Sequence, residues 1–393
     1  MDITTYLEPI EPEKIGFVTN EFLVRLGDRI KTYYAGAPMP DLDQCTIAIV
    51  GVCDDRGSVA NPGCAAAPDA IRRYLYRLAV PCEGLHVADL GNIAPGRSKE
   101  DTYFALTEVL YTLLDRGIVT IVVGGGDDLV FPIYKAYETL GRVINICSVD
   151  SRFNLEGGPD VNSNNYLQHI VMQQPNYLFD FTNIGYQSYF VGDEMVRLMD
   201  DLKFDAVSVG AIQLNLERAE PLVRYADLVT VDISAIRQSD APANADPSPH
   251  GFHSEDVCRI ARFAGMSDKT TCFALTELNP DRDRDGQTAH AMAHALWFFI
   301  EGVMGRKNDY PYLDKQNYKR FTVELRDHGM DIVFYKSKKT DRWWMEVPCI
   351  DDERRTRYAP HLLVPCNHSD YERAMQNELP DLWWKHYNRI NEQ

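Results

Sequence analysis

The chain has 393 residues, of which 45% are hydrophobic and 25% charged, so it can bury a large core and carries no signature of disorder. Its formal net charge of -18 argues against nucleic acid or an anionic membrane surface as a partner, because both would be repelled. No apolar stretch reaches the roughly 18 residues that span a bilayer, and the acidic N-terminus lacks a signal peptide's basic and apolar regions. We therefore expect a cytoplasmic protein whose nine cysteines are reduced and mostly buried.

Short apolar runs rich in β-branched residues predict strands that are buried on both faces. The runs cover residues 45–52, 119–125, 142–150, 205–212, 228–234 and 271–278. Helix-period segments at residues 68–78, 102–117 and 254–265 lie between them, the last with Ser254 as N-cap and Gly265 as stop. This alternation predicts a three-layer α/β/α fold with a doubly wound, mostly parallel sheet.

The composition divides the chain into three predicted parts. Residues 1–44 form an N-terminal extension, and residues 45–305 form the main α/β/α domain. Residues 306–393 are rich in aromatic side chains and include a hairpin-like stretch at 321–337. Because no low-complexity linker precedes this last part, we expect a small C-terminal α+β extension that packs on the main domain.

Three polar segments each fall where a predicted strand ends. They read GGGDDL at 124–129, DSRFNL at 150–155 and TVDISAI at 230–236. In a doubly wound sheet, ligands bind beyond the carboxyl ends of the strands. The polar side chains of these segments are therefore predicted to converge on one edge of the sheet.

The spacing of these segments resembles that of the ureohydrolases, the family of arginase, agmatinase and formimidoylglutamase. In that family the segments read roughly G-G-D-H-S, D-A-H-x-D and S-x-D-x-D and hold two manganese ions. Further similar blocks at 50–78, 242–251 and 276–280 extend the resemblance from Ile47 to Gly302. DSRFNL is most similar to the formimidoylglutamase version, D-A-H-F-D-L, through Phe153 and Leu155. The resemblance implies an arginase-like fold.

Carried over position by position, the resemblance implies a changed set of metal ligands. Asp150 and Asp232 take the two bridging positions. The other four positions hold, in place of two histidines and two aspartates, Asp128, Arg152, Asn154 and Ser234. One predicted subsite, made only of oxygen ligands, consists of Asp128, Asp150, Asn154 and Asp232, with Ser234 beside it. The cation at the other subsite is predicted to be replaced by Arg152, whose guanidinium pairs with Asp150 and Asp232.

These exchanges set the expectation for cofactors. The cluster holds either no metal, as a structural Asp-Arg network, or one weakly bound Mn, Mg or Ca ion, and a classical di-manganese centre is not expected. Asp127 is expected to contact the ligand side chains and hold them in place, rather than to bind metal itself. No residue is assigned a catalytic role.

Three further residues are candidates for binding a substrate. Glu277 matches a family residue that salt-bridges a cationic substrate group, although it is equally suited to pair with Arg152. Ser163 and Asn165 lie in the stretch 162–168, where formimidoylglutamases carry a substrate loop. The resemblance implies that these side chains line the pocket.

Two functions follow from this reading. The first is a pseudo-enzyme that keeps the ureohydrolase scaffold and binds a small polar ligand or a protein partner. The alternative is an active hydrolase of C-N bonds in linear amidines, such as formimidoylglutamate or an arginine-like substrate, with one metal or an altered metal site. In either case the resemblance implies a homo-oligomer.

Overall fold

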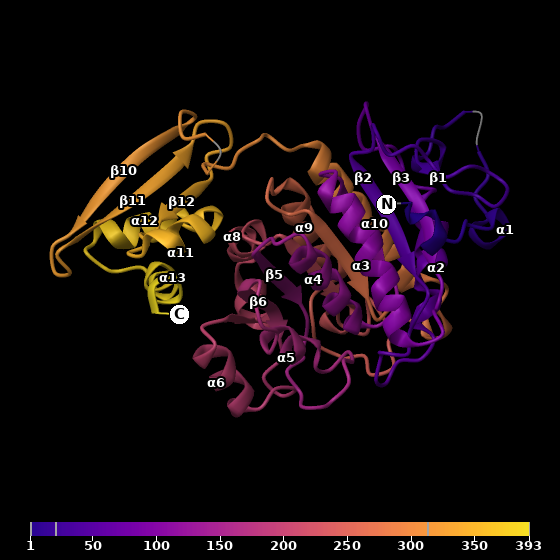
Figure 1. Cartoon of the computed structure of the whole chain (residues 1–393), viewed down its shortest axis with the longest axis horizontal. Helices are drawn as coiled ribbons and strands as arrows, with labels where there is room; N and C mark the ends of the chain where they lie inside the picture. The colour runs from indigo at the N-terminus through magenta and orange to yellow at the C-terminus, as the bar shows by residue number, and fades with distance from the viewer. Residues whose placement is uncertain (1, 20–21, 313, 393) are drawn as a thin grey trace.

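In the part of the chain that the computed structural model describes (residues 2–19, 22–312 and 314–392), nine parallel strands form a central sheet (Figure 1). Their order across the sheet is β1-β3-β2-β4-β9-β8-β5-β6-β7. The strands are β1 (Lys31–Thr32), β2 (Ile47–Val52), β3 (Val87–Ile93), β4 (Val119–Val123), β5 (Ile144–Val149), β6 (Leu178–Tyr186), β7 (Asp205–Ser208), β8 (Leu228–Asp232) and β9 (Cys272–Thr276). The prediction of a doubly wound, mostly parallel sheet is confirmed.

The central strands are apolar because helices cover both of their faces. Every residue of β2, β4, β5, β8 and β9 is buried. The run 205–212 differs from its prediction as a single strand, since β7 ends at Ser208 and helix α7 (Val209–Leu214) follows at once. Ser208 Oγ accepts a hydrogen bond from the backbone N–H of Ala211, 3.4 Å away, and so caps that helix.

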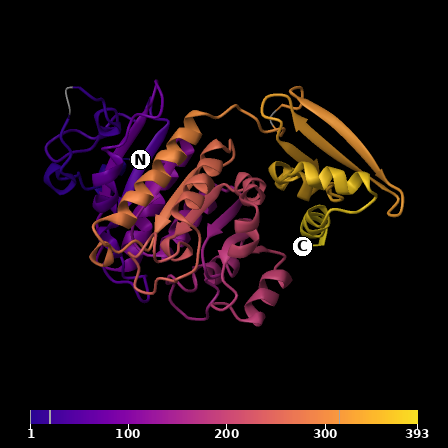
Figure 2. The same cartoon turned by 180° about the vertical axis from the view of Figure 1, so that it is seen from behind.

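Two hydrophobic clusters fill the space between the sheet and its helices. The helices of the main body are α1 (Pro12–Ile15), α2 (Ala67–Leu75), α3 (Lys99–Asp115), α4 (Val130–Thr139), α5 (Tyr166–Val171), α6 (Asp193–Asp201), α7 (Val209–Leu214), α8 (Ala219–Arg224), α9 (Ser254–Met266) and α10 (Gln287–Met304). Residues of α2, α9 and α10 share one cluster, and residues of α3, α4 and α5 share the other. Figure 2 shows α9 and α10 covering the face turned away in Figure 1. None of the described helices combines the length and apolar character needed to cross a membrane.

Beyond α10, the chain forms a small second sheet with three helices at one end of the molecule (Figures 1 and 2). The antiparallel strands are β10 (Tyr318–Leu325), β11 (Met330–Ser337), β12 (Trp343–Glu346) and β13 (Leu363–Cys366), and the helices are α11 (Asp352–Arg357), α12 (His368–Met375) and α13 (Asp381–Glu392). Its hydrophobic cluster includes Phe179 and Tyr225 from the main body. Tyr225 Oη also donates a hydrogen bond to the carbonyl of His361 at 2.8 Å, so the two parts share a packed and hydrogen-bonded contact.

Candidate metal centre

A cavity of about 140 Å³ opens at the carboxyl ends of the central strands. The strand ends supply its acidic residues, because β5 is followed by Asp150, β8 ends at Asp232 and β9 is followed by Glu277. Its lining also includes Ser58, Asn61, Arg152, Asn154, Ser163, Asn164, Ser234 and Asp246. The polar segments therefore do converge on one edge of the sheet.

Three aspartates form a tight group at this edge. Oxygen atoms of Asp127, Asp150 and Asp232 all lie within 4.8 Å of one another, and the three side chains are buried. Burial raises the pKa of Asp127 and Asp232 well above the usual range, and repulsion from Asp150 adds to the effect. Burial likewise raises the pKa of Asp150. Three carboxylates this close together need protons or cations to neutralise them.

Asn154 joins two members of the group. Its Nδ2 donates to Asp150 Oδ2 at 2.6 Å and to Asp127 Oδ2 at 2.9 Å. Its φ of 54° is in the left-handed region, which asparagine adopts more readily than most residues. Asn154 was predicted to offer an oxygen to a metal. In the structure it acts as a donor, because the carboxylates that face it only accept hydrogen bonds.

Ser234 lies against Asp150 and Asp232. Its backbone N–H donates to Asp232 Oδ1 at 2.6 Å, and its Oγ donates to Asp150 Oδ1 at 3.3 Å. The Oγ also lies 3.0 Å from Ser151 Oγ. Ser234 therefore holds Asp150 and Asp232 in place through the hydrogen bonds that it donates to both.

Asp127 and Asp128 differ from their predicted roles. Asp127 belongs to the three-aspartate group, and Thr276 Oγ1 donates to its Oδ1 at 2.7 Å. Asp128 points elsewhere and accepts a hydrogen bond from Tyr103 Oη. The two residues follow one another in a 3₁₀ turn, Asp127–Leu129, where successive side chains point in different directions. The signal that sequence reasoning missed was the position of Asp127 as the first acidic residue after β4.

Arg152 does not make the predicted ion pair with Asp150 and Asp232. Its Nη2 lies 3.2 Å from Asp246 Oδ2, and its guanidinium carbon lies 4.2 Å from the centre of the Phe190 ring. Only its backbone N–H reaches Asp150, donating to Oδ1 at 2.9 Å. The physical reason is solvation, since a guanidinium that is 35% exposed keeps part of its hydration and gains a cation-π contact.

Glu277 lines the cavity with its carboxylate fixed by three donors. Ser58 Oγ and Asn61 Nδ2 donate to Oε2 at 2.8 and 3.0 Å, and the Asp127 N–H donates to Oε1 at 3.0 Å. Burial raises the pKa of Glu277, and these hydrogen bonds oppose the shift. The alternative in which Glu277 pairs with Arg152 is not what the structure contains, because that guanidinium binds Asp246.

The predicted substrate loop divides into a residue that faces the cavity and one that does not. Ser163 lines the cavity, and its Oγ accepts a hydrogen bond from the Val59 N–H at 3.1 Å. The Asn165 side chain is used inside the loop, with Oδ1 accepting from the Asn162 N–H and Nδ2 donating to the Asp160 carbonyl. Asn164 lines the cavity in its place, because Asn165 is fully buried by these loop contacts.

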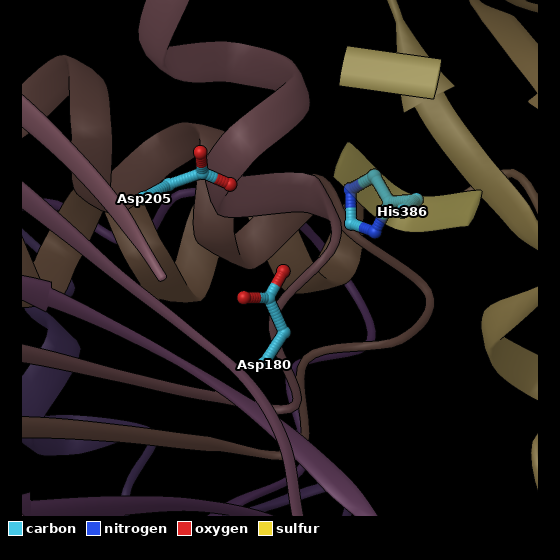
Figure 3. Close-up of side chains that lie close together, drawn as sticks. All are labelled: Asp180, Asp205 and His386. Carbon is cyan, nitrogen blue, oxygen red and sulfur yellow. The ribbon is translucent and has the colours of Figure 1, made fainter. Parts of the chain in front are cut away.

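A second acidic group lies between the main sheet and α13. Asp180 on β6, Asp205 on β7 and His386 on α13 point toward a common space (Figure 3), with potential ligand atoms within 4.8 Å of one another. Asp180 is paired with Arg389 at 2.6 Å, and Asp205 is paired with Lys385 at 2.7 Å. In this second group, the charges of two carboxylates are balanced by those of two cations. By contrast, no Lys or Arg in the described part of the chain forms an ion pair with the three-aspartate group. Charge balance therefore singles out the three-aspartate group as the better candidate for a metal centre.

A buried carboxylate cluster at the strand ends of a doubly wound parallel sheet is typical of α/β proteins that bind divalent cations there. Residues 45–300 match the Arginase family, and the chain belongs to this family of ureohydrolases. The expected arginase-like fold is thereby confirmed.

Formimidoylglutamases are among the relatives in sequence and in structure. Those of Lysinibacillus sphaericus and Geobacillus thermodenitrificans are 25% and 27% identical over 308 residues, covering 74% of this chain and 95% and 94% of theirs. Trypanosoma cruzi formiminoglutamase with Mn2+2 superposes with a TM-score of 0.65 at 20% identity, covering 72% of this chain and 99% of that one. The Bacillus subtilis formimidoylglutamase gives 0.64 at 15% identity, covering 75% and 99%.

The expectation of no metal or a single weakly bound one, rather than a classical di-manganese centre, is wrong. A relative with this fold contains Mn2+2, and this chain gathers Asp127, Asp150 and Asp232 in a buried group, where Asp128 had been predicted in place of Asp127. The prediction failed because it left out Asp127 and placed the Arg152 guanidinium where a second cation would lie. In the structure that guanidinium binds Asp246 instead.

Proposed function

We propose that this protein is a metal-dependent hydrolase of C-N bonds in linear amidines, with formimidoylglutamate as the leading substrate. The observation that carries the proposal is the group of Asp127, Asp150 and Asp232, buried together beside Glu277 without a pairing lysine or arginine in the described chain. Such a group fits hard divalent cations, which prefer carboxylate oxygens. The formimidoylglutamases among its relatives support the choice of substrate class.

Charge arithmetic supports a pair of Mn2+ ions. When ionised, three aspartates and Glu277 carry four negative charges, which two divalent cations balance. Asp127, Asp150 and Asp232 would hold the ions, and a bound pair supplies a polarised water that ionises near neutral pH. Ser234 fixes two of these carboxylates through its N–H and hydroxyl, so the protein provides a preorganised set of oxygen ligands.

Glu277 is the proposed binding residue for the amidine. Its two oxygens are held in place by Ser58, Asn61 and the backbone of Asp127. A protonated amidine is planar and presents parallel N–H donors, which match a carboxylate in a charge-assisted, bidentate pair. The substrate is thereby oriented with its amidine carbon toward Asp150 and Asp232, which line the same cavity.

A second candidate function is binding of an amidine or a partner without turnover. It is favoured by two observations: the three-aspartate group includes no histidine, and Asn154 donates to it rather than offering an oxygen. Both functions use the same cavity, and they differ in whether a C-N bond is broken.

The deciding experiment combines metal analysis with an assay for formamide and glutamate released from formimidoylglutamate. We expect close to two Mn2+ per chain after loading, and turnover that Asp232→Asn reduces by at least about 100-fold. Asp331→Asn, an exposed change on β11, should keep both metal and activity. Bound metal without turnover of formimidoylglutamate, arginine or agmatine would favour the binding function, and absence of bound metal would refute the proposal.

A further inference from the structure

A larger cavity, of about 610 Å³, lies at the amino ends of the central strands, opposite the strand ends that carry the three-aspartate group. It is lined at the strand starts by Ile144, the first residue of β5, by Tyr177 before β6, by Asp227 before β8 and by Thr271 before β9. Its other wall belongs to the C-terminal extension and comprises Tyr312, Thr356, Arg357, Pro360 and His361. Cavities of this size between two packed units are common sites for small ligands.

The charged groups around this cavity leave it positive. Arg142 and Arg357 both line it, and neither is within ion-pair distance of a carboxylate in the described chain. Within the described part of the chain they donate hydrogen bonds to backbone carbonyls, from Arg142 to Leu114 at 3.4 Å and from Arg357 to Asn176 at 3.1 Å. Both guanidiniums therefore keep donors available for a ligand.

The one acidic residue of the lining is already neutralised. Asp227 is paired with the buried Lys269 and accepts a hydrogen bond from the Asn145 N–H at 2.8 Å. Attraction to Arg142 adds to this stabilisation of the Asp227 carboxylate. A positive cavity on a chain of net charge -18 is a local exception that favours anions.

His361 adds a second requirement for the ligand, namely a hydrogen-bond donor. Its Nε2 lies 3.2 Å from the Val143 carbonyl, which only accepts, so Nε2 carries the proton. Burial and the nearby Lys269 lower the pKa of His361 well below its usual value, which keeps the ring neutral. Nδ1 is then a buried acceptor, and it has no hydrogen-bond partner among the described residues. A donor from a ligand would satisfy it.

We propose that this cavity binds a small molecule that carries a carboxylate or phosphate group together with a hydroxyl or amino donor. The anionic group is held by Arg142 and Arg357, and the donor satisfies His361 Nδ1. This site lies at the amino ends of β5, β8 and β9, whose carboxyl ends carry the metal centre, so it is separate from the substrate cavity.

Calorimetric titration of the full chain with two probes tests the proposal and separates the two anion classes. Glycerol 3-phosphate combines a phosphate with hydroxyls, and malate combines carboxylates with a hydroxyl. We expect one of them to bind at one equivalent per chain and to bind equally well to Asp232→Asn, in which the metal centre is altered. Each of Arg142→Gln and Arg357→Gln should weaken binding about tenfold or more, the effect of losing a hydrogen bond to a charged group.

Two further variants make the outcome specific. His361→Phe, which keeps the stacking on Phe179, should weaken binding of the hydroxyl-bearing probe but not of sulfate, which has no hydrogen-bond donor at neutral pH. Arg320→Gln, an exposed change on β10, should leave the affinity unchanged. Failure of both probes to bind, unchanged binding in the combined Arg142→Gln and Arg357→Gln variant, or an equal loss in Arg320→Gln would each overturn the proposal.

Discussion

Asp128 is a buried carboxylate that follows Asp127 in the chain but does not belong to the three-aspartate group. Tyr103 Oη donates to its Oδ2, and its Oδ1 has no hydrogen-bond partner among the described residues. Burial raises the pKa of Asp128 from 3.8 to about 7, and the hydrogen bond from Tyr103 opposes this shift. The folded chain therefore holds a proton on Asp128 over a pH range in which the unfolded chain has lost it.

This raised pKa predicts how stability changes with pH. The stability that the protonated Asp128 contributes is complete below about pH 3.8 and is lost as the pH rises through about 7. Asp128→Asn cannot titrate, so its free energy of unfolding should fall less steeply over this range, by up to roughly 1.4 kcal/mol per pH unit. Urea unfolding of the metal-free protein at several pH values measures the difference. Parallel curves for wild type and variant would contradict the assignment, and Asp331→Asn is the control.

The candidate site was only partly predictable from single residues. The strand-end positions of Asp150 and Asp232 predict that they meet, because parallel strands end at one edge of a sheet. The sequence did not show that Asp127, and not Asp128, joins the group. In a turn of 3₁₀ helix each side chain is rotated by about 120° from the last, so neighbouring residues point in different directions. The direction of Arg152 depends on Asp246 and Phe190, which are distant in sequence, so no local pattern could show it.

The helices α9 and α10 illustrate the same limit for whole elements. The sequence suggested Gly265 as the stop signal of α9, yet the helix continues to Met266. A Cβ on Gly265 would lie 2.2 Å from the Phe299 carbonyl oxygen, and one on Gly302 would lie 2.8 Å from that of Arg262. Both glycines therefore let two helix backbones approach closely, a need set by the partner helix and not visible in either segment alone. Strands β3 and β6 were missed for a different reason, because buried polar residues such as Asp89 and Asp180 interrupt their apolar runs.

Gly265→Ala is predicted to destabilise the protein. The added methyl group collides with the backbone of α10, and overpacking of this kind costs typically about 1–3 kcal/mol. Gly210→Ala is the matched control, since Gly210 lies within α7 and a Cβ there meets no atom within 4 Å. The control should gain up to about 1 kcal/mol from helix propensity. Urea unfolding compares the two, and equal stabilities would show that α9 and α10 have room to separate.

At the scale of the whole molecule, ion pairs connect the C-terminal extension to β6 and β7, the last two strands on one side of the main sheet. Arg389 and Lys385 of α13 reach Asp180 on β6 and Asp205 on β7. His386, on the same helix, faces the two aspartates (Figure 3). The Arg389 and Asp180 side chains are both at most 2% exposed, whereas the Lys385 and Asp205 side chains are 27% and 19% exposed. The buried pair should therefore matter more to docking of the extension.

Removing one partner of the buried pair is predicted to loosen the whole extension. Arg389→Met leaves Asp180 buried without its cation, a change that typically costs about 3–5 kcal/mol. The double variant Asp180→Asn with Arg389→Met removes both charges and should regain most of this stability, while Lys385→Met should cost only about 1 kcal/mol or less. Thermal unfolding gives the energies, and amide hydrogen exchange along α13 shows whether the loss is local to the extension. If Arg389→Met and Lys385→Met had equal effects, or if exchange rose evenly over both sheets, the buried pair would not be what docks the extension.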